Sequence, residues 1–161
     1  MDAVTYPDPA AAEAIATRFI PLHATAGSPA AKAFPLRLLW LPTLAVLDRR
    51  GAEHYRSTNA LAVPDLLDVL DIGEALVRMR EAGYAESSAL LAAVETRRPA
   101  SPFAAEARYW SGVAAYFAAG RDRAAIARVW STLRADFPAS SWAARAMTFH
   151  FGEGGVPEVD G

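Results

Sequence analysis

The chain has 161 residues, with 16 lysine and arginine residues against 18 acidic residues and a formal net charge of −2. No segment collects charges of one sign, so the sequence lacks the basic surface of a nucleic-acid or anionic-membrane binder. The absence of cysteine excludes a disulfide framework, a thiolate nucleophile and any cysteine-ligated metal site. A chain of this length can bury roughly two thirds of its surface, which suffices for a packed core.

Neither a targeting signal nor a membrane span is predicted. The N-terminus has no positive segment followed by an apolar run, and no window reaches the ~18 apolar residues of a spanning helix. We therefore expect a cytoplasmic chain. The hydrophobic fraction of 53% is rich in alanine, which favours close-packed helices over strands.

The N-terminal elements are expected to be short. Asp8 can cap a helix that starts at Pro9 and runs to about Arg18. The apolar stretch 19–24 is typical of a strand, although Pro21 places it at an edge or a bulge. Residues 29–35 favour a brief helix.

The clearest local signal is a hairpin over residues 43–57, because two β-rich runs flank the turn residues 48–51. Helical spacing then continues from about Val63 to Gly83, a suitable C′ residue. We expect Asp65 and Asp68 on the polar face of this helix. No further strand is expected after Pro64.

The second half contains an internal repeat. Residues 99–107 match residues 138–146 at an offset of 39 with six identities in nine, and an Ala-Gly pair recurs at 82–83 and 119–120. Offsets of this size indicate stacked helical hairpins. Trp110 and Trp130 lie in apolar stripes and are expected to be buried against each other's helices.

The repeat resembles the divergent kind of tetratricopeptide repeat. The residues that carry the resemblance are Tyr109-Trp110, Gly112, Tyr116 and Gly120 on one helix, Ala124-Ala125-Ile126 on the next, and Phe137-Pro138 at the start of the following unit. The resemblance implies an antiparallel helical array. Its concave side would offer Arg108, Tyr109, Tyr116 and Arg145 to a protein partner.

Residues 2 to about 72 resemble the part of a thioredoxin-like domain that follows its active site. Trp40-Leu41-Pro42-Thr43 matches the family's cis-proline loop, the 44–57 segment matches its hairpin, and a closing helix follows from about Val63. The family's first strand and CxxC motif would lie before residue 1. The resemblance therefore implies a redox family but no redox chemistry in this sequence.

The missing strand has a structural consequence, because in the resembled fold it lies between the strands at 19–24 and 43–47. Unpaired N–H and C=O groups there would each cost on the order of 1–3 kcal/mol if buried. Three outcomes are open: the two strands close up antiparallel, a partner supplies a strand, or the gene product starts upstream of Met1.

The residues expected to bind an extended peptide are Trp40, Leu41, Pro42 and Thr43, since backbone beside a cis-proline can accept a strand. No residue is expected to be catalytic, and no cofactor is implied. His23, His54 and His150 are isolated and lack the spacing of metal ligands, so solvated or core-edge roles are expected and no metal site is predicted.

The sequence thus predicts a mostly helical α/β chain with three parts: a partial thioredoxin-like domain at 1–72, helical repeats at 73–150 and a flexible tail at 151–161. The predicted function is a redox-inactive protein- or peptide-binding module. Two alternatives stay open: a truncated form of an active disulfide oxidoreductase, and a tetratricopeptide-type scaffold. The predicted partner is a protein or peptide, with no nucleic acid or membrane.

Overall fold

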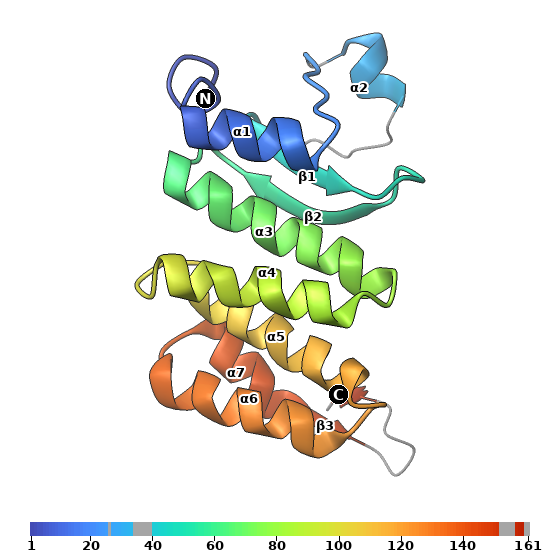
Figure 1. Cartoon of the computed structure of the whole chain (residues 1–161), viewed down its shortest axis with the longest axis vertical. Helices are drawn as coiled ribbons and strands as arrows, with labels where there is room; N and C mark the ends of the chain where they lie inside the picture. The colour runs from blue at the N-terminus through green and yellow to red at the C-terminus, as the bar shows by residue number, and fades with distance from the viewer. Residues whose placement is uncertain (26, 34–39, 152–156, 160–161) are drawn as a thin grey trace. The chain divides into compact units, whose positions relative to one another are not determined.

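The computed structural model describes residues 1–25, 27–33, 40–151 and 157–159, and most of these residues lie in helices (Figure 1). A small antiparallel pair of strands completes the first part, so the prediction of a mostly helical α/β chain is correct. The chain divides into two compact units, Met1–Gly73 (unit 1) and Glu74–Gly161 (unit 2). No helix in the described ranges is both long and apolar enough to cross a membrane.

Unit 1 begins with helix α1 (Pro9–Arg18), whose start was predicted correctly. The Asp8 carboxylate accepts hydrogen bonds from the amides of Ala10 and Ala11 at 2.9 and 3.3 Å. Pro9 needs no such partner because it has no N–H group. A short helix α2 (Pro29–Ala33) follows, and the end of the predicted 29–35 helix lies outside the described residues.

The predicted strand at 19–24 is wrong, because these residues belong to no strand. Phe19 has an extended backbone, with φ −131° and ψ 161°, so the local conformation suits a strand. An extended segment becomes a strand only when a neighbour accepts its backbone hydrogen bonds, and none of the described residues does so here. The outcome in which 19–24 and 43–47 close up antiparallel is therefore also excluded.

The predicted hairpin is confirmed. Strands β1 (Thr43–Leu47) and β2 (Glu53–Thr58) pair antiparallel in a two-stranded sheet, with a bulge between Val46 and Leu47. The turn is closed by Asp48, whose Oδ1 accepts from the amides of Arg50 and Ala52 at 2.8 and 2.9 Å. Asp favours this Asx turn through its own side-chain hydrogen bonds, which explains why the turn residues in the sequence predicted the hairpin correctly.

Helix α3 (Val63–Arg80) starts in unit 1 and supplies most of its core. Leu66 and Leu70 pack with Ala11 of α1, and the partly buried side chains around them include Leu44 of β1. A Cβ atom at Gly73 would lie 2.5 Å from a Val46 methyl group, so this glycine lets α3 approach β1. One face of the hairpin is therefore covered.

Two carboxylates on α3 are buried, and for one of them the sequence prediction was wrong. Asp68 has no exposed surface, although periodicity placed it on the polar face. Asp71 is almost fully buried and lies 2.7 Å from the Arg18 guanidinium at the end of α1. This ion pair joins α1 to α3: shielding of the carboxylate from water increases the attraction between the two charges, and the desolvation of the carboxylate offsets that gain.

Unit 2 consists of helices α4 (Tyr84–Arg97), α5 (Ala104–Ala118), α6 (Arg123–Asp136) and α7 (Ser141–Thr148), which follow one another with reversing direction (Figure 1). Helix α5 packs against α4, α6 and α7. Trp130 is buried, as predicted, and its indole N–H donates to the Tyr109 carbonyl at 3.1 Å. Trp110 is only half-buried. The buried residues of this core are Ala105, Tyr109, Tyr116, Ile126, Trp130, Leu133, Ala143 and Ala146.

Helices α3 and α5 end in the same way. In each helix, the second residue after the C-cap donates a backbone hydrogen bond to a carbonyl of the last turn. The Gly83 amide donates to the Arg78 carbonyl, and the Arg121 amide donates to the Tyr116 carbonyl, both at 2.8 Å. These are Schellman motifs, which require a left-handed residue at C′. That residue is Gly120 in α5 (φ 66°) but Ala82 in α3 (φ 63°). The prediction of Gly83 as C′ is therefore wrong by one position.

The chain ends in a second pair of strands that was not predicted. Strand β3 (Phe149–Phe151) pairs antiparallel with β4 (Pro157–Val159). The expectation of no strand beyond Pro64 is thus wrong. Three-residue strands carry too little alternation for a sequence pattern to reveal them. The other residues of the predicted 151–161 tail lie outside the described residues.

Candidate peptide-binding edge

The first feature of the site is the outer edge of β1. The Pro42 carbonyl accepts from the Asn59 amide at 2.9 Å, so the hydrogen-bonded pairs of this ladder recur two residues apart, at Leu44 and Val46. Thr43 and Ala45 therefore direct their N–H and C=O groups away from β2. Among the described residues no third strand receives them. An open edge of this kind is a template for another strand.

The predicted peptide-binding residues Trp40, Leu41, Pro42 and Thr43 lie at the start of this edge. The Leu41–Pro42 peptide bond is cis, as expected from the sequence, whereas peptide binding by these residues stays a prediction. The Thr43 hydroxyl donates to the Trp40 carbonyl at 2.6 Å and so fixes the turn. The side chains of Trp40 and Leu41 are 64% and 53% exposed, which leaves two large apolar groups in water at the start of β1.

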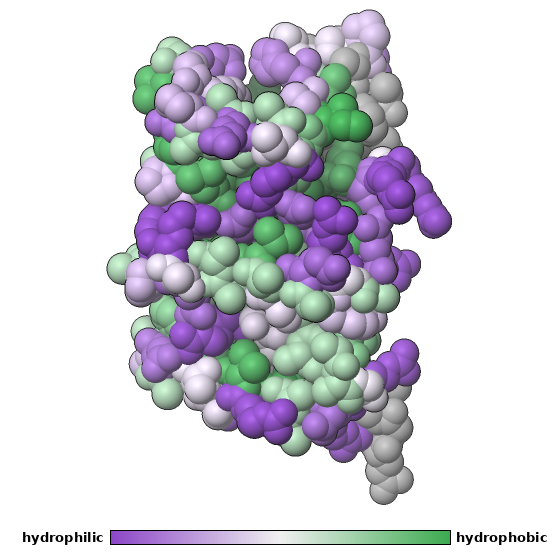
Figure 2. All heavy atoms as spheres, viewed as in Figure 1, coloured by the Kyte–Doolittle hydropathy of each residue, from purple (hydrophilic) through white to green (hydrophobic). Residues whose placement is uncertain are grey.

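A second apolar feature follows α1. Residues 20–25, which we call the exposed segment, are exposed throughout, with Ile20 at 99% and Leu22 at 58%. Figure 2 shows apolar surface over the chain between α1 and α2. The large hydrophobic residues that the described structure leaves exposed are Val4, Ile20, Leu22, Trp40, Leu41 and Met147. Four of the six lie close together in the sequence as two pairs, Ile20 with Leu22 and Trp40 with Leu41.

An Asp–His pair closes the far end of the hairpin, and the sequence analysis missed it. His54 Nε2 lies 3.1 Å from Asp48 Oδ2, and both side chains are largely buried. The hydrogen bond from His54, together with the amides of Ala52 and Arg50, lowers the pKa of Asp48 to about 2. The hairpin register could have revealed the contact, because a turn at 48–52 brings these two side chains together. The pair supports the turn, because the same Asp48 carboxylate also accepts from the amides of Arg50 and Ala52.

The residues expected to meet a partner on the helical repeats lie in a different environment. Tyr109 and Tyr116 are only 7% and 3% exposed and belong to the core of unit 2. Burial raises the pKa of Tyr109. Arg145 is exposed, and its guanidinium lies 4.3 Å from the centre of the Trp142 ring. The tyrosines are therefore packing residues, because α5 is covered on several sides and needs apolar contacts around most of its circumference.

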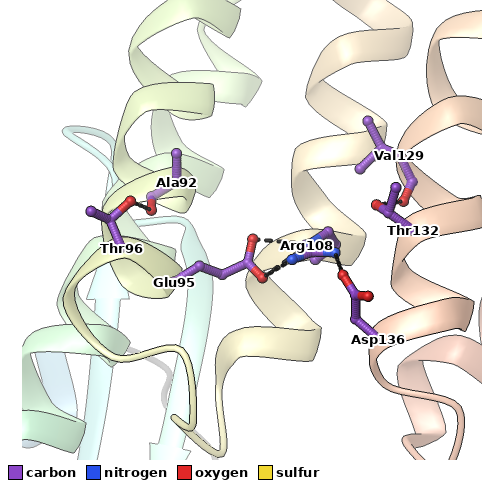
Figure 3. Close-up of polar contacts among 7 residues, drawn as sticks. All are labelled: Ala92, Glu95, Thr96, Arg108, Val129, Thr132 and Asp136. Atoms are coloured by element: carbon purple, nitrogen blue, oxygen red, sulfur yellow. Dashed lines mark hydrogen bonds and ion pairs between the residues drawn. The ribbon is translucent and has the colours of Figure 1, made fainter.

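Arg108 joins three helices of unit 2 (Figure 3). Its guanidinium donates to both carboxylate oxygens of Glu95 on α4, and its Nη1 donates to Asp136 Oδ2 at the end of α6 at 2.6 Å. The hydrogen bond to Glu95 is the main cause that raises the pKa of Arg108. The planar guanidinium group has several N–H donors and can bind two carboxylates at once. Arg108 is thus committed to contacts within its own unit.

The described residues contain no group of three or more histidine, aspartate or glutamate side chains placed to hold a metal ion. His23 lies 4.0 Å from Asp2 at an exposed position. His150 lies in β3. Comparison with protein-family models, with curated proteins and with solved structures found no match to this chain.

Proposed function

We propose that this chain is a protein-binding module that receives an extended polypeptide strand on the outer edge of β1. The observation that carries the proposal is the open edge at Thr43 and Ala45 beside the exposed side chains of Trp40 and Leu41. Backbone groups of the edge give affinity to any extended segment, and apolar side chains next to it select segments with apolar residues at alternate positions.

The order of elements in unit 1 supports a thioredoxin-like origin for this edge. A cis-proline, an antiparallel hairpin and a helix follow one another, as the resemblance implies. With no cysteine in the chain, thiol–disulfide exchange has no nucleophile. The proposed activity is therefore binding without redox chemistry, and unit 2 serves as a tetratricopeptide-like helical support.

A synthetic heptapeptide of alternating valine and threonine, with lysine at both ends for solubility, tests the proposal. The chain has four tryptophans, and Trp40 is the one in unit 1. When fluorotryptophan is incorporated into the protein, addition of the peptide should shift the fluorine resonance of Trp40 in a saturable manner. The three resonances of unit 2 should stay in place.

Two controls define the contact. A peptide whose central valines are N-methylated cannot donate main-chain hydrogen bonds from those valines and should bind at least about tenfold more weakly, since each such bond contributes about 1 kcal/mol. Leu41→Ala should weaken binding, whereas Val4→Ala, at an exposed apolar position outside the edge, should not. Equal binding of the N-methylated peptide, or no shift of Trp40 at millimolar peptide, would contradict strand addition.

A further inference from the structure

We propose that two copies of this chain associate, each placing its exposed segment (residues 20–25) on the outer edge of β1 of the other copy. The inference rests on the proposed function, because it names a strand that the edge receives. Each copy carries both halves of the contact. The backbone groups of Thr43 and Ala45 on its edge pair with no strand of the described residues, and its exposed segment is apolar and forms no strand with any described residue of its own chain.

The position of Pro21 fits this role. In an extended strand, alternate residues direct their backbone groups to the same side, so Ile20, Leu22 and Ala24 can all face β1 while Pro21 faces away. A proline is tolerated in an edge strand when its missing N–H lies on the solvent side. This arrangement also places the side chains of Ile20 and Leu22 together on one face of the enlarged sheet.

Symmetry and area favour a second copy as the occupant. Because every copy gives one strand and receives one, a two-fold arrangement closes and leaves neither segment unpaired. Ile20, Leu22, Trp40 and Leu41 are each more than half exposed. An aromatic side chain such as Trp40 offers roughly 150–250 Å² and an aliphatic one somewhat less, so two copies present on the order of 1,000 Å² of apolar surface at these exposures. That is close to the roughly 1,200 Å² at which specific interfaces begin.

Single engineered cysteines test the contact directly, since the chain has none of its own. One preparation carries Ile20→Cys, Leu22→Cys or Ala24→Cys, and it is mixed with a second preparation that carries Ala45→Cys. Directly opposed Cβ atoms on paired strands lie ~4.5–5.5 Å apart, close enough for a disulfide after small shifts. We expect one of the three mixtures to give a linked heterodimer on mild oxidation. Val4→Cys mixed with Ala45→Cys is the matched control. The proposal would be overturned if none of the three mixtures gave more linked heterodimer than this control.

Sedimentation equilibrium gives an independent measurement. The wild-type chain should show a concentration-dependent dimer. Replacing Ile20 and Leu22 by aspartate should weaken dimerisation at least about a hundredfold, because two buried apolar side chains are lost. Val4→Asp should leave it unchanged. A wild-type chain that stays monomeric, or a dimer insensitive to the double replacement, would contradict the proposal.

The double variant Ile20→Asp, Leu22→Asp also separates the two proposals, because its β1 edge is intact. If the valine–threonine heptapeptide binds this variant and the wild-type chain is monomeric, the dimer is refuted and the proposed function stands. Failure of the peptide to bind this variant as well would refute both.

Discussion

The C′ positions of α3 and α5 allow a paired stability test. Ala82 and Gly120 occupy the same place in two Schellman motifs, with φ of 63° and 66°. A left-handed conformation costs an L-residue roughly 1–2 kcal/mol relative to glycine. Glycine in turn gives the unfolded chain more freedom, which offsets about 0.4–1 kcal/mol of that gain. Ala82→Gly should therefore raise the free energy of unfolding of unit 2 by about 0.5–1 kcal/mol.

Gly120→Ala should have the opposite effect and a similar size. A Cβ atom at Gly120 would meet nothing within 4 Å, so its cost comes from the backbone alone. Because the two positions are independent, the double variant should have nearly the stability of the wild type. Ala92→Gly is the matched control, since the same replacement at an exposed position inside α4 should destabilise by about 1 kcal/mol.

Urea unfolding followed by tryptophan fluorescence measures these changes. In a Trp40→Phe background all remaining tryptophans lie in unit 2, so the signal reports that unit. Destabilisation by Ala82→Gly to the same extent as by Ala92→Gly would show that residue 82 is not the left-handed C′ residue. The reasoning from the two Schellman motifs would then fail.

Further predictions concern the hairpin and the core of unit 2. The pKa of Asp48 is lowered to about 2 from a usual value near 4, so its ionised form stabilises the hairpin above pH ~4. This contribution should disappear as the pH falls from about 4 to about 2, and Asp48→Asn should flatten that part of the stability–pH curve measured by urea unfolding. Trp130→Ala should cost about 3–5 kcal/mol, measured by the same method with circular dichroism, whereas exposed Trp40→Ala should stay within ~0.5 kcal/mol. Arg108→Lys should lose about 1 kcal/mol at low salt, because one ammonium cannot bridge two carboxylates as the guanidinium group does, and the loss should shrink in 1 M NaCl. A salt-independent loss would place the effect in packing instead.

Local patterns predicted the elements whose causes are local. Asp8 and Pro9 define the start of α1, and Asp48 defines the turn of the hairpin, since each acts on amides a few residues away. The internal repeat also has a structural counterpart. The hydroxyls of Ser101 and Ser140, which occupy equal places in the repeat, each accept a backbone amide at the beginning of a helix.

Features that depend on distant partners could not be predicted from one sequence. Residues 19–24 have strand composition, but a strand also requires a neighbour, and composition cannot supply one. Asp68 is buried together with the next two residues, Val69 and Leu70, so burial on α3 is not confined to one face as an amphipathic pattern assumes. The bridge from Arg108 to Glu95 and Asp136 spans three helices, and no fixed spacing encodes it.

The weak point of unit 1 and its proposed activity have the same origin. A two-stranded sheet is marginal in water unless helices or further strands cover it. Here α3 covers the face of β1 that carries Leu44 and Val46, while the backbone of Thr43 and Ala45 has no partner strand in the described structure. Any strand that adds to this edge both binds and completes the sheet, so part of the binding free energy becomes stability of unit 1. The proposed function therefore implies that binding and folding of this unit are coupled, and that an added strand would cover the apolar side chains exposed beside the edge.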